Sequence, residues 1–385
     1  VTLGGRDIYL GHYNTAASRR EYNRLIAEWT VHHGTLPNKQ SSDLTISELL
    51  ASFLRYAKAY HSGAELENFA YAMRPLKALY GPTRVADFGP LALKTVRQKM
   101  IEADLARKTI NGRVNRIRHI VKWGVENELV PPSVLHGLQA VAGLRFGRTE
   151  AREAEPVKPV PDAFVEAVLP YVSPQVAAMI ELQRITGMRS GEVTIIRGAD
   201  INMTGRVWVY TVPTHKTAWR GHERKVYFGP KAQQILKPFL KADLEAYLFS
   251  PADSLLRIYG ARHAARRTPL SYGNRPGTNR KKSPKKRAGP VYDTHSYRRA
   301  VTYGIMAANK ARLAAAMEAG IEADKVAFVP HWHPHQLRHN AATNLRREHG
   351  IEVARIILGH RSPAITEVYA EVDHTRAIDV MARIG

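Results

Sequence analysis

Hydrophobic residues recur at helical spacing through much of the chain, most regularly between residues 45 and 144. Four segments there place apolar side chains three and four residues apart, as on one face of a helix: 45–60, 65–81, 89–105 and 109–130. Thr45 with Glu48 predicts a capped start for the first segment, and Gly81 predicts the end of the second. This part of the chain is therefore predicted to be a helical domain.

Helical patterns return in residues 175–189 and in the last third of the chain. Turn-forming residues predict where these helices begin and end: Gly187, Pro334, Gly350, Gly359 and Ser362-Pro363. The final predicted helix carries Tyr369 almost two turns from its start.

Two other regions alternate apolar and polar residues, as strands do. Residues 206–214 and 224–229 read as paired strands around a hairpin tip, and residues 1–13 read as a hairpin broken by Gly4-Gly5. A helix with Tyr22, Leu25 and Trp29 on one face follows the first hairpin. The predicted fold is mainly α with small β-sheets, in the α+β class.

The same patterns divide the chain into domains. Residues 1–30 form a small hairpin and helix unit, 31–43 a linker, 44–148 the helical domain, 149–160 a charged, Pro-rich linker, and 161–385 the last domain. Within the last domain, residues 257–299 are expected to be an irregular and intensely basic insertion. Such a run is either ordered on a polyanion or disordered.

The charge of the chain points to a polyanionic partner. Lys and Arg total 57 against 34 Asp and Glu, a formal net charge of +23, and nucleic acid is the commonest partner of such an excess. No apolar run approaches the length of a membrane-spanning helix, so no membrane partner is expected. The absence of Cys excludes disulfides and thiol chemistry, and with no secretory signal at the start of the sequence it predicts an intracellular protein.

Several reactive side chains occur in separate segments at turns and helix faces. These candidate site residues are Arg189, Lys216, His335, Arg338, His360 and Tyr369. Arginines match two phosphate oxygens and stay charged, which suits the charge of a pentavalent phosphorus transition state. A phenol is a nucleophile once a base or positive charge activates it, and an imidazole can accept its proton. This set predicts the cutting of a DNA strand by transesterification, with no metal or other cofactor.

A metal site is the competing interpretation of the histidine-rich segment. HWHPHQLRH contains His331, His333, His335 and His339, and the last two have the i,i+4 spacing of a zinc pair. Gln336 stands where a metalloprotease would have its glutamate, and no third acidic ligand lies at a recognisable distance. No metal is therefore expected, and the histidines could alternatively serve in capping and packing.

Residues 161–385 resemble the tyrosine recombinase (phage integrase) family in the order of their motifs. These are Arg-Ser-Gly-Glu, a Lys in a hairpin, His-Gln-Leu-Arg-His, and Leu-Gly-His followed nine residues later by a Tyr. The resemblance implies that Tyr369 is the nucleophile, that the other five candidates activate it, and that Glu192 supports the first arginine. It further implies that 44–148 is a core-binding domain forming a C-shaped clamp on DNA with the catalytic domain. Residues 1–30 resemble the end of an arm-binding domain.

The resemblance implies double-stranded recombination sites as the partner, and a homotetramer on paired sites that is a monomer or weak oligomer without DNA. An accessory directionality factor is a further partner it allows. It also implies a cytoplasmic, nucleoid-associated protein encoded by a bacterium, phage or mobile element. Expected DNA contacts lie on two helices of the helical domain and in the basic insertion: Lys94, Arg97, Lys99, Arg113, Arg116, Arg118, Lys122, Arg280, Lys281 and Lys282. Charged faces of this kind are otherwise simply solvated.

Three alternatives remain open at this point. A type IB topoisomerase would use a similar set of residues to relax supercoils, and a non-catalytic DNA-binding protein could share the fold. Lys225 lies in the same hairpin as Lys216 and competes for the catalytic role; Lys216 is preferred because Thr217 follows it, as in the integrase subgroup.

Overall fold

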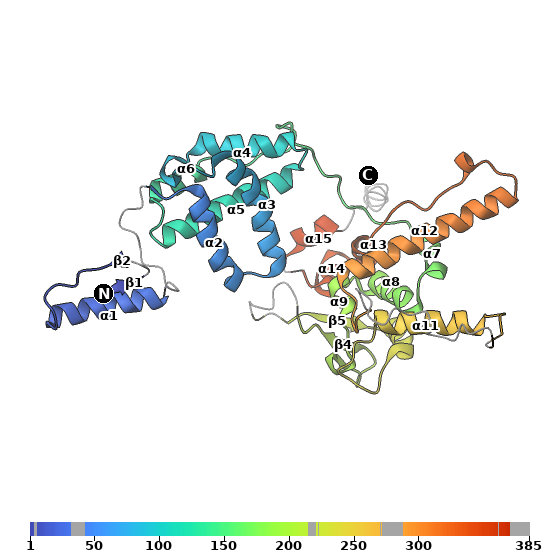
Figure 1. The fold of residues 1–385 in the computed structure, drawn as a ribbon. Coiled ribbons are helices and arrows are strands. Elements are labelled where there is room, and N and C mark those ends of the chain that lie inside the picture. The colour runs from blue at the N-terminus through green and yellow to red at the C-terminus, as the bar shows by residue number, and fades with distance from the viewer. Residues whose placement is uncertain are drawn as a thin grey trace, which may run out of the picture. The chain divides into compact units, whose positions relative to one another are not determined.

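A computed structural model describes residues 1–3, 6–31, 43–214, 221, 223–269, 271, 288–360 and 362–369. Contacts within the chain divide it into two units, Val1–Pro156 and Val157–Gly385. Helices dominate both units and the sheets are small (Figure 1). The prediction of a mainly helical α+β fold is confirmed. Among the residues described, no helix is long and apolar enough to cross a bilayer.

The first unit begins with an antiparallel pair, β1 (Thr2–Leu3) and β2 (Arg6–Asp7), in which Thr2 faces Asp7. This pair and the helix after it match the predicted hairpin and helix. The helices of the unit are α1 (Ala16–Val31), α2 (Ile46–Tyr60), α3 (Gly63–Tyr80), α4 (Pro90–Glu102), α5 (Arg107–Glu126) and α6 (Pro132–Gln139), with a 3₁₀ turn η2 (Val85–Asp87).

Helices α2 to α6 pack around one apolar core. The predicted capping box is present: the Thr45 side chain accepts from the Glu48 backbone N–H, and the Glu48 carboxylate accepts from the Thr45 N–H at 2.9 Å. Phe53 is fully buried and packs edge-on against Trp123, with ring centroids 5.5 Å apart. The apolar faces read from the sequence are thus the faces that meet in this core.

The second unit holds a three-stranded antiparallel sheet in the order β3 (Ile201–Asn202), β4 (Trp208–Thr211), β5 (Lys225–Phe228). The predicted pairing of the two longer strands is confirmed, with Trp208 facing Phe228 and Thr211 facing Lys225. Strand β3 was not predicted, because two residues are too short to show an alternating pattern.

The helices of the second unit pack with this sheet around one apolar core. They are α7 (Asp162–Glu166), α8 (Pro174–Thr186), α9 (Ser190–Thr194), α10 (Pro230–Leu236), α11 (Pro251–Ala264), α12 (Thr294–Glu318), α13 (Pro334–His349), α14 (Ile351–Leu358) and α15 (Pro363–Tyr369), with 3₁₀ turns η3 (Leu169–Tyr171), η4 (Gly198–Asp200), η6 (Lys237–Phe239) and η8 (Ala323–Lys325). Helix α8 is central, because it contacts α9, α10, α12 and α13.

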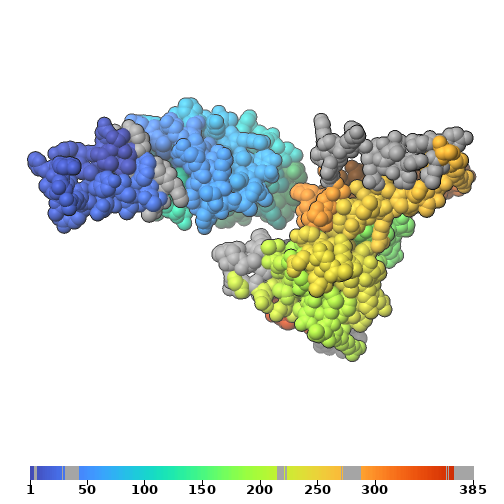
Figure 2. Space-filling model, turned by 60° about the horizontal axis from the view of Figure 1, so that its bottom comes forward, coloured from blue at the N-terminus to red at the C-terminus, as the bar shows by residue number. Residues whose placement is uncertain are grey.

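The prediction that residues 257–299 are irregular is wrong at both ends. Helix α11 continues to Ala264, and α12 already begins at Thr294. Both helices have local caps: the Ser250 side chain accepts from the Asp253 N–H, and Asp293 accepts from the Ser296 N–H. These caps outweigh the basic composition on which the prediction rested. Helix α11 lies at the surface of its unit (Figure 2), and residues 270 and 272–287 lie outside the described residues.

Three helices at the end of the described chain pack on one another, α13, α14 and α15 (Figure 1). Pro334 occupies the first turn of α13, which stops before Gly350, as predicted. Helix α14 stops before Gly359, whose φ of 66° is left-handed and favours glycine. The turn at Gly359 sends the chain back into α15, so His360 lies between two helix ends.

Candidate active site

Arg338 is a fully buried arginine of helix α13 in the second unit. Its Nη1 donates to the Gly187 carbonyl at 2.5 Å, and its Nη2 donates to the Leu358 carbonyl at 2.8 Å. The same Nη2 lies 2.7 Å from Nε2 of His360. Two segments far apart in the sequence, at Gly187 and at 358–360, therefore hold one guanidinium in a single orientation.

His360 connects this arginine to the last described helix. Because a guanidinium only donates, Nε2 of His360 accepts from Arg338, and the ring proton is assigned to Nδ1. Nδ1 lies 3.0 Å from Oγ1 of Thr366 in α15. Burial, followed by the charges of Arg338 and Arg189, lowers the pKa of His360 to about 3. The imidazole is therefore neutral near neutral pH.

A buried carboxylate joins two further arginines. Oε1 of Glu192 lies 2.6 Å from Nη1 of Arg189 and 3.5 Å from Nε of Arg224, and Oε2 accepts from the Arg189 backbone N–H at 2.9 Å. The Glu192 and Arg224 side chains are only 4% and 6% exposed, whereas Arg189 is 40% exposed. Burial alone would raise the pKa of Glu192, but Arg224 and Arg189 outweigh it and keep that pKa below its usual value.

Arg224 is the member of this group that the sequence analysis missed. Its Nη1 donates to the Ile357 carbonyl at 3.0 Å, at the end of α14. A Cβ on Gly359 would lie 2.5 Å from that same nitrogen, so the glycine leaves room for the guanidinium. A signal existed in the sequence: strand alternation places Arg224 on the face of Val226 and Phe228, which is buried.

His335 lies one turn before Arg338 on α13 and is half-buried. Burial, then the nearby His339 and Arg338, and more weakly Arg189, lower the pKa of His335 to about 4. Because Arg189 and Arg338 act on the pKa of both His335 and His360, these four side chains share one electrostatic environment. Within the described part of the chain, no group of three or more His, Asp or Glu side chains is arranged to hold a metal.

Two of the predicted site residues are described only in part or not at all. Lys216 lies outside the described residues, in the gap at 215–220. Tyr369 is the last residue of α15, and only its backbone is described. Since α15 contacts both α13 and α14, the backbone of Tyr369 belongs to the same helix cluster as Arg338 and His360.

The basic residues predicted to bind DNA lie on α4 and α5, and several make contacts within the first unit. Arg116 forms a two-point ion pair with Glu65 at 2.9 and 3.0 Å, Arg97 donates to the Ala142 carbonyl, and Arg118 donates to that of Leu138. Lys99 and Lys122 pair with neighbouring glutamates on their own helices, and Arg113 stacks over Tyr71. Lys94 is exposed on α4, and Arg280, Lys281 and Lys282 lie outside the described residues. Contact with DNA stays a prediction for all of them.

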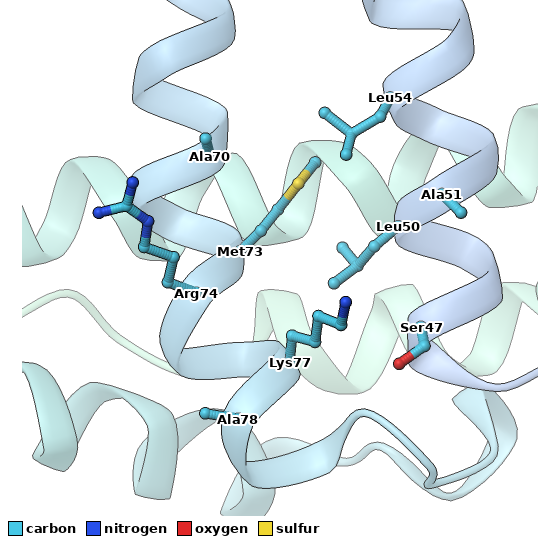
Figure 3. A pocket seen from close by; sticks show the side chains of 9 residues that line it. All are labelled: Ser47, Leu50, Ala51, Leu54, Ala70, Met73, Arg74, Lys77 and Ala78. Carbon is cyan, nitrogen blue, oxygen red and sulfur yellow. The ribbon is translucent and has the colours of Figure 1, made fainter.

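A cavity of about 570 Å³ opens between α2 and α3 in the first unit, separate from the arginine and histidine cluster. Leu50, Leu54 and Met73 form its apolar wall, and Arg74 and Lys77 lie along α3 beside it (Figure 3). Its lining contains none of the predicted catalytic residues, all of which belong to the second unit.

Comparisons with known proteins identify the family of this chain. The family model described as "Phage integrase family" matches residues 168–376, more than half of the chain. Among solved structures, an integrase of transposon Tn1549 in complex with transposon right-end DNA is 16% identical, with a TM-score of 0.59 over 89% of this chain and 99% of that one. A search of curated proteins found no match.

Two lambda integrase structures are also similar. A dimer bound to a COC′ core site is 12% identical, with a TM-score of 0.57 over 93% of this chain and 88% of that one. A tetramer bound to a Holliday junction is 13% identical, with a TM-score of 0.53 over 95% and 90%. At these identities the similarity concerns the fold.

Proposed function

This chain belongs to the phage integrase family of tyrosine recombinases, and from that premise we propose that it is a site-specific DNA recombinase. It cuts and rejoins DNA strands through a covalent 3′-phosphotyrosine intermediate, without ATP or a metal. The observation that carries this proposal is the convergence of Arg189, Arg338, His335 and His360 in one cluster that α15, with Tyr369 at its end, packs against.

The proposed reaction is a transesterification at a phosphodiester of DNA. The Tyr369 oxygen bonds to phosphorus while the bond from phosphorus to the 5′ oxygen breaks. The phenol proton passes to a base, and the 5′ oxygen takes a proton from an acid and leaves as a hydroxyl. A 5′-hydroxyl of a partner duplex then gives up its proton and bonds to the same phosphorus, while the bond from phosphorus to the Tyr369 oxygen breaks and the tyrosine leaves as a phenol that has regained its proton. The phosphotyrosine linkage retains the energy of the broken bond, which is why no ATP is needed.

Arg189 and Arg338 are suited to different parts of phosphate binding. Arg338 is held in one orientation by hydrogen bonds to Gly187, Leu358 and His360, which suits electrostatic stabilisation of a transition state, but its side chain is fully buried and meets a phosphate only once the surrounding segments move apart. Arg189 is held by Glu192 yet remains 40% exposed, so its guanidinium can meet a phosphate arriving from solvent. We assign both to the non-bridging phosphate oxygens.

The two imidazoles also take different roles. Both ring nitrogens of His360 already face protein partners, Arg338 and Thr366, so we assign His360 to orienting the arginine. His335 is half-buried and neutral, and we assign it to accept the phenol proton. Its pKa of about 4 reflects burial first and nearby positive charge second, and a bound phosphodiester would offset the positive charge and strengthen the base.

Lys216 is the proposed donor of a proton to the departing 5′ oxygen. The competing lysine, Lys225, lies 2.9 Å from Glu223, which raises the pKa of Lys225 and makes it a weaker acid. The contact to Glu223 therefore favours Lys216.

We further propose double-stranded DNA as the partner, with a tetramer on paired sites as the working assembly. The net charge of +23 supports a polyanionic partner. Similar folds occur in a lambda integrase dimer on a core site and a lambda integrase tetramer on a Holliday junction. The basic faces of α4 and α5 are the proposed additional contact with the duplex.

The test is covalent capture on overlapping nicked duplexes that tile the DNA flanking the gene for this chain. Wild-type protein is expected to give an adduct that survives denaturing electrophoresis and is lost on protease treatment. Tyr369→Phe should lose the adduct and keep its DNA affinity, since only one hydroxyl is removed. Tyr303→Phe, which changes an exposed tyrosine of α12, is the control and should retain the adduct.

No adduct with wild-type protein on any duplex would favour a non-catalytic DNA-binding protein. An adduct that accompanies supercoil relaxation by single molecules, with no strand exchange at any concentration, would favour a topoisomerase.

A further inference from the structure

We propose that Thr366 is a positioning residue that fixes the helix of Tyr369 to the buried Arg338 through His360. This inference rests on the proposed function, since it explains how the chain places its nucleophile. It adds a residue outside the six side chains and the supporting Glu192 assigned above.

The contact is a continuous chain of hydrogen bonds through the core. Oγ1 of Thr366 lies 3.0 Å from Nδ1 of His360, Nε2 of His360 lies 2.7 Å from Nη2 of Arg338, and Nη1 of Arg338 donates to the Gly187 carbonyl at 2.5 Å. Thr366 is fully buried and His360 nearly so. These hydrogen bonds link α15 to the turn that precedes Arg189.

The direction of each bond follows from the chemistry of the groups. Arginine has no acceptor, so it donates to Nε2 of His360, and the neutral ring then carries its proton on Nδ1. Nδ1 donates to the Thr366 oxygen. Arg338 therefore fixes the tautomer of His360, and Thr366 supplies the acceptor for the Nδ1 proton. Loss of the hydroxyl would leave this buried N–H without that acceptor and would remove the hydrogen bond between α15 and His360.

The position of α15 depends strongly on this contact. The helix has seven residues, too few to be stable without tertiary contacts. Ala364, Ile365 and Glu367 are exposed, and Thr366 alone is buried among the α15 side chains that the structure describes. Tyr369 follows Thr366 by three residues, about one helical turn. Fixing Thr366 therefore fixes the end of the helix that carries Tyr369.

Two substitutions separate this hydrogen bond from simple packing. Thr366→Val has nearly the same shape but no hydroxyl, whereas Thr366→Ser keeps the hydroxyl and loses a methyl group. Thr302→Val is the matched control, because Thr302 is a half-buried threonine of α12 whose hydroxyl lies 3.5 Å from Nε2 of His331, outside the cluster.

The experiment measures the rate of adduct formation on the nicked duplex that wild-type protein cleaves, together with DNA affinity and thermal unfolding. Thr366→Val is expected to slow adduct formation by about tenfold or more, with DNA affinity within about twofold of wild type. Thr366→Ser should recover most of the rate, and Thr302→Val should match wild type. As a second readout, the Nδ1 proton of His360 should be protected from exchange with water in wild type and in Thr366→Ser, and should exchange faster in Thr366→Val, in which it has lost its acceptor.

The positioning role would be overturned if Thr366→Val formed the adduct at the wild-type rate, or if Thr366→Val and Thr366→Ser slowed adduct formation equally. Either result would leave the recombinase assignment intact. Absence of an adduct with wild-type protein would instead overturn the proposed function, and this inference with it.

Discussion

Replacing Glu192 with glutamine tests whether the arginines of the site are held by a buried ion pair. The substitution keeps the size of the side chain and removes its negative charge. In the folded protein the carboxylate lies 2.6 Å from Arg189 and 3.5 Å from Arg224. The amide group of glutamine would also direct donors at guanidinium groups that can only donate. Arg224 would then be a buried cation without its counterion.

The expected loss of stability follows from burial. Breaking a buried ion pair by removing one partner costs about 3–5 kcal/mol, because the remaining charge is uncompensated. The Arg224 and Glu192 side chains are 6% and 4% exposed, so the buried value applies to this pair. Glutamine retains one acceptor oxygen, so the expected loss of unfolding free energy lies near the lower end of this range, at about 3 kcal/mol. With a urea dependence of about 3 kcal/mol per M, the unfolding midpoint of the second unit should fall by about 1 M.

The assay is urea unfolding of the full chain, followed by circular dichroism and by tryptophan fluorescence. Glu245→Gln is the matched control, because Glu245 pairs with Arg197 at 2.7 Å but is 70% exposed. That exposed pair should contribute only about 0–1 kcal/mol. Equal and small shifts for the two variants would refute the view that a buried ion pair holds Arg224 and Arg189 in place.

Four further predictions address catalysis and solution behaviour. Arg338→Ala should slow adduct formation by about 10²-fold or more, as expected for a lost transition-state donor, and an unchanged rate would remove Arg338 from the proposed mechanism. Lys216→Ala should slow cleavage far more than Lys225→Ala, and substrates with a 5′-thio leaving group, which needs no acid, should rescue Lys216→Ala. The pKa values of His335 and His360 lie near 4 and 3 in the folded protein against 6.5 for the free side chain. The unfolded chain therefore binds more protons in that window, and the thermal midpoint should fall as the pH drops from about 6.5 towards 4; a flat profile would contradict the burial of these imidazoles. DNA affinity should fall steeply with added salt, since phosphate contacts release counterions, and a salt-independent affinity would contradict the basic interface.

Much of the secondary structure could be predicted from short-range patterns. The capping box at Thr45 and the stops at Gly187, Gly350 and Gly359 depend on residues within a few positions of each other, so the sequence displays them directly. The hairpin of β4 and β5 was visible for the same reason. The ends of the basic insertion were misjudged, because composition was weighed above the caps that start α11 and α12.

The residues of the predicted site could also be selected from the sequence, because Arg, His, Lys and Tyr at turns and helix starts form a pattern in the linear chain. Their partners could not. Arg224 contacts Glu192, 32 residues away in the sequence, and the Ile357 carbonyl, 133 residues away. Contacts at such sequence separations produce no periodic pattern of residue types.

The amino-acid sequence by itself determined the helices, their ends and the inventory of groups that can bind and attack a phosphate, since these follow from propensity, capping and side-chain chemistry. Only the tertiary structure decided that Arg338 is fully buried, that His360 accepts from it, and that Thr366 anchors the helix of Tyr369. The physical reason is that these hydrogen bonds join segments brought together by packing, and packing depends on the whole core rather than on any local stretch of chain.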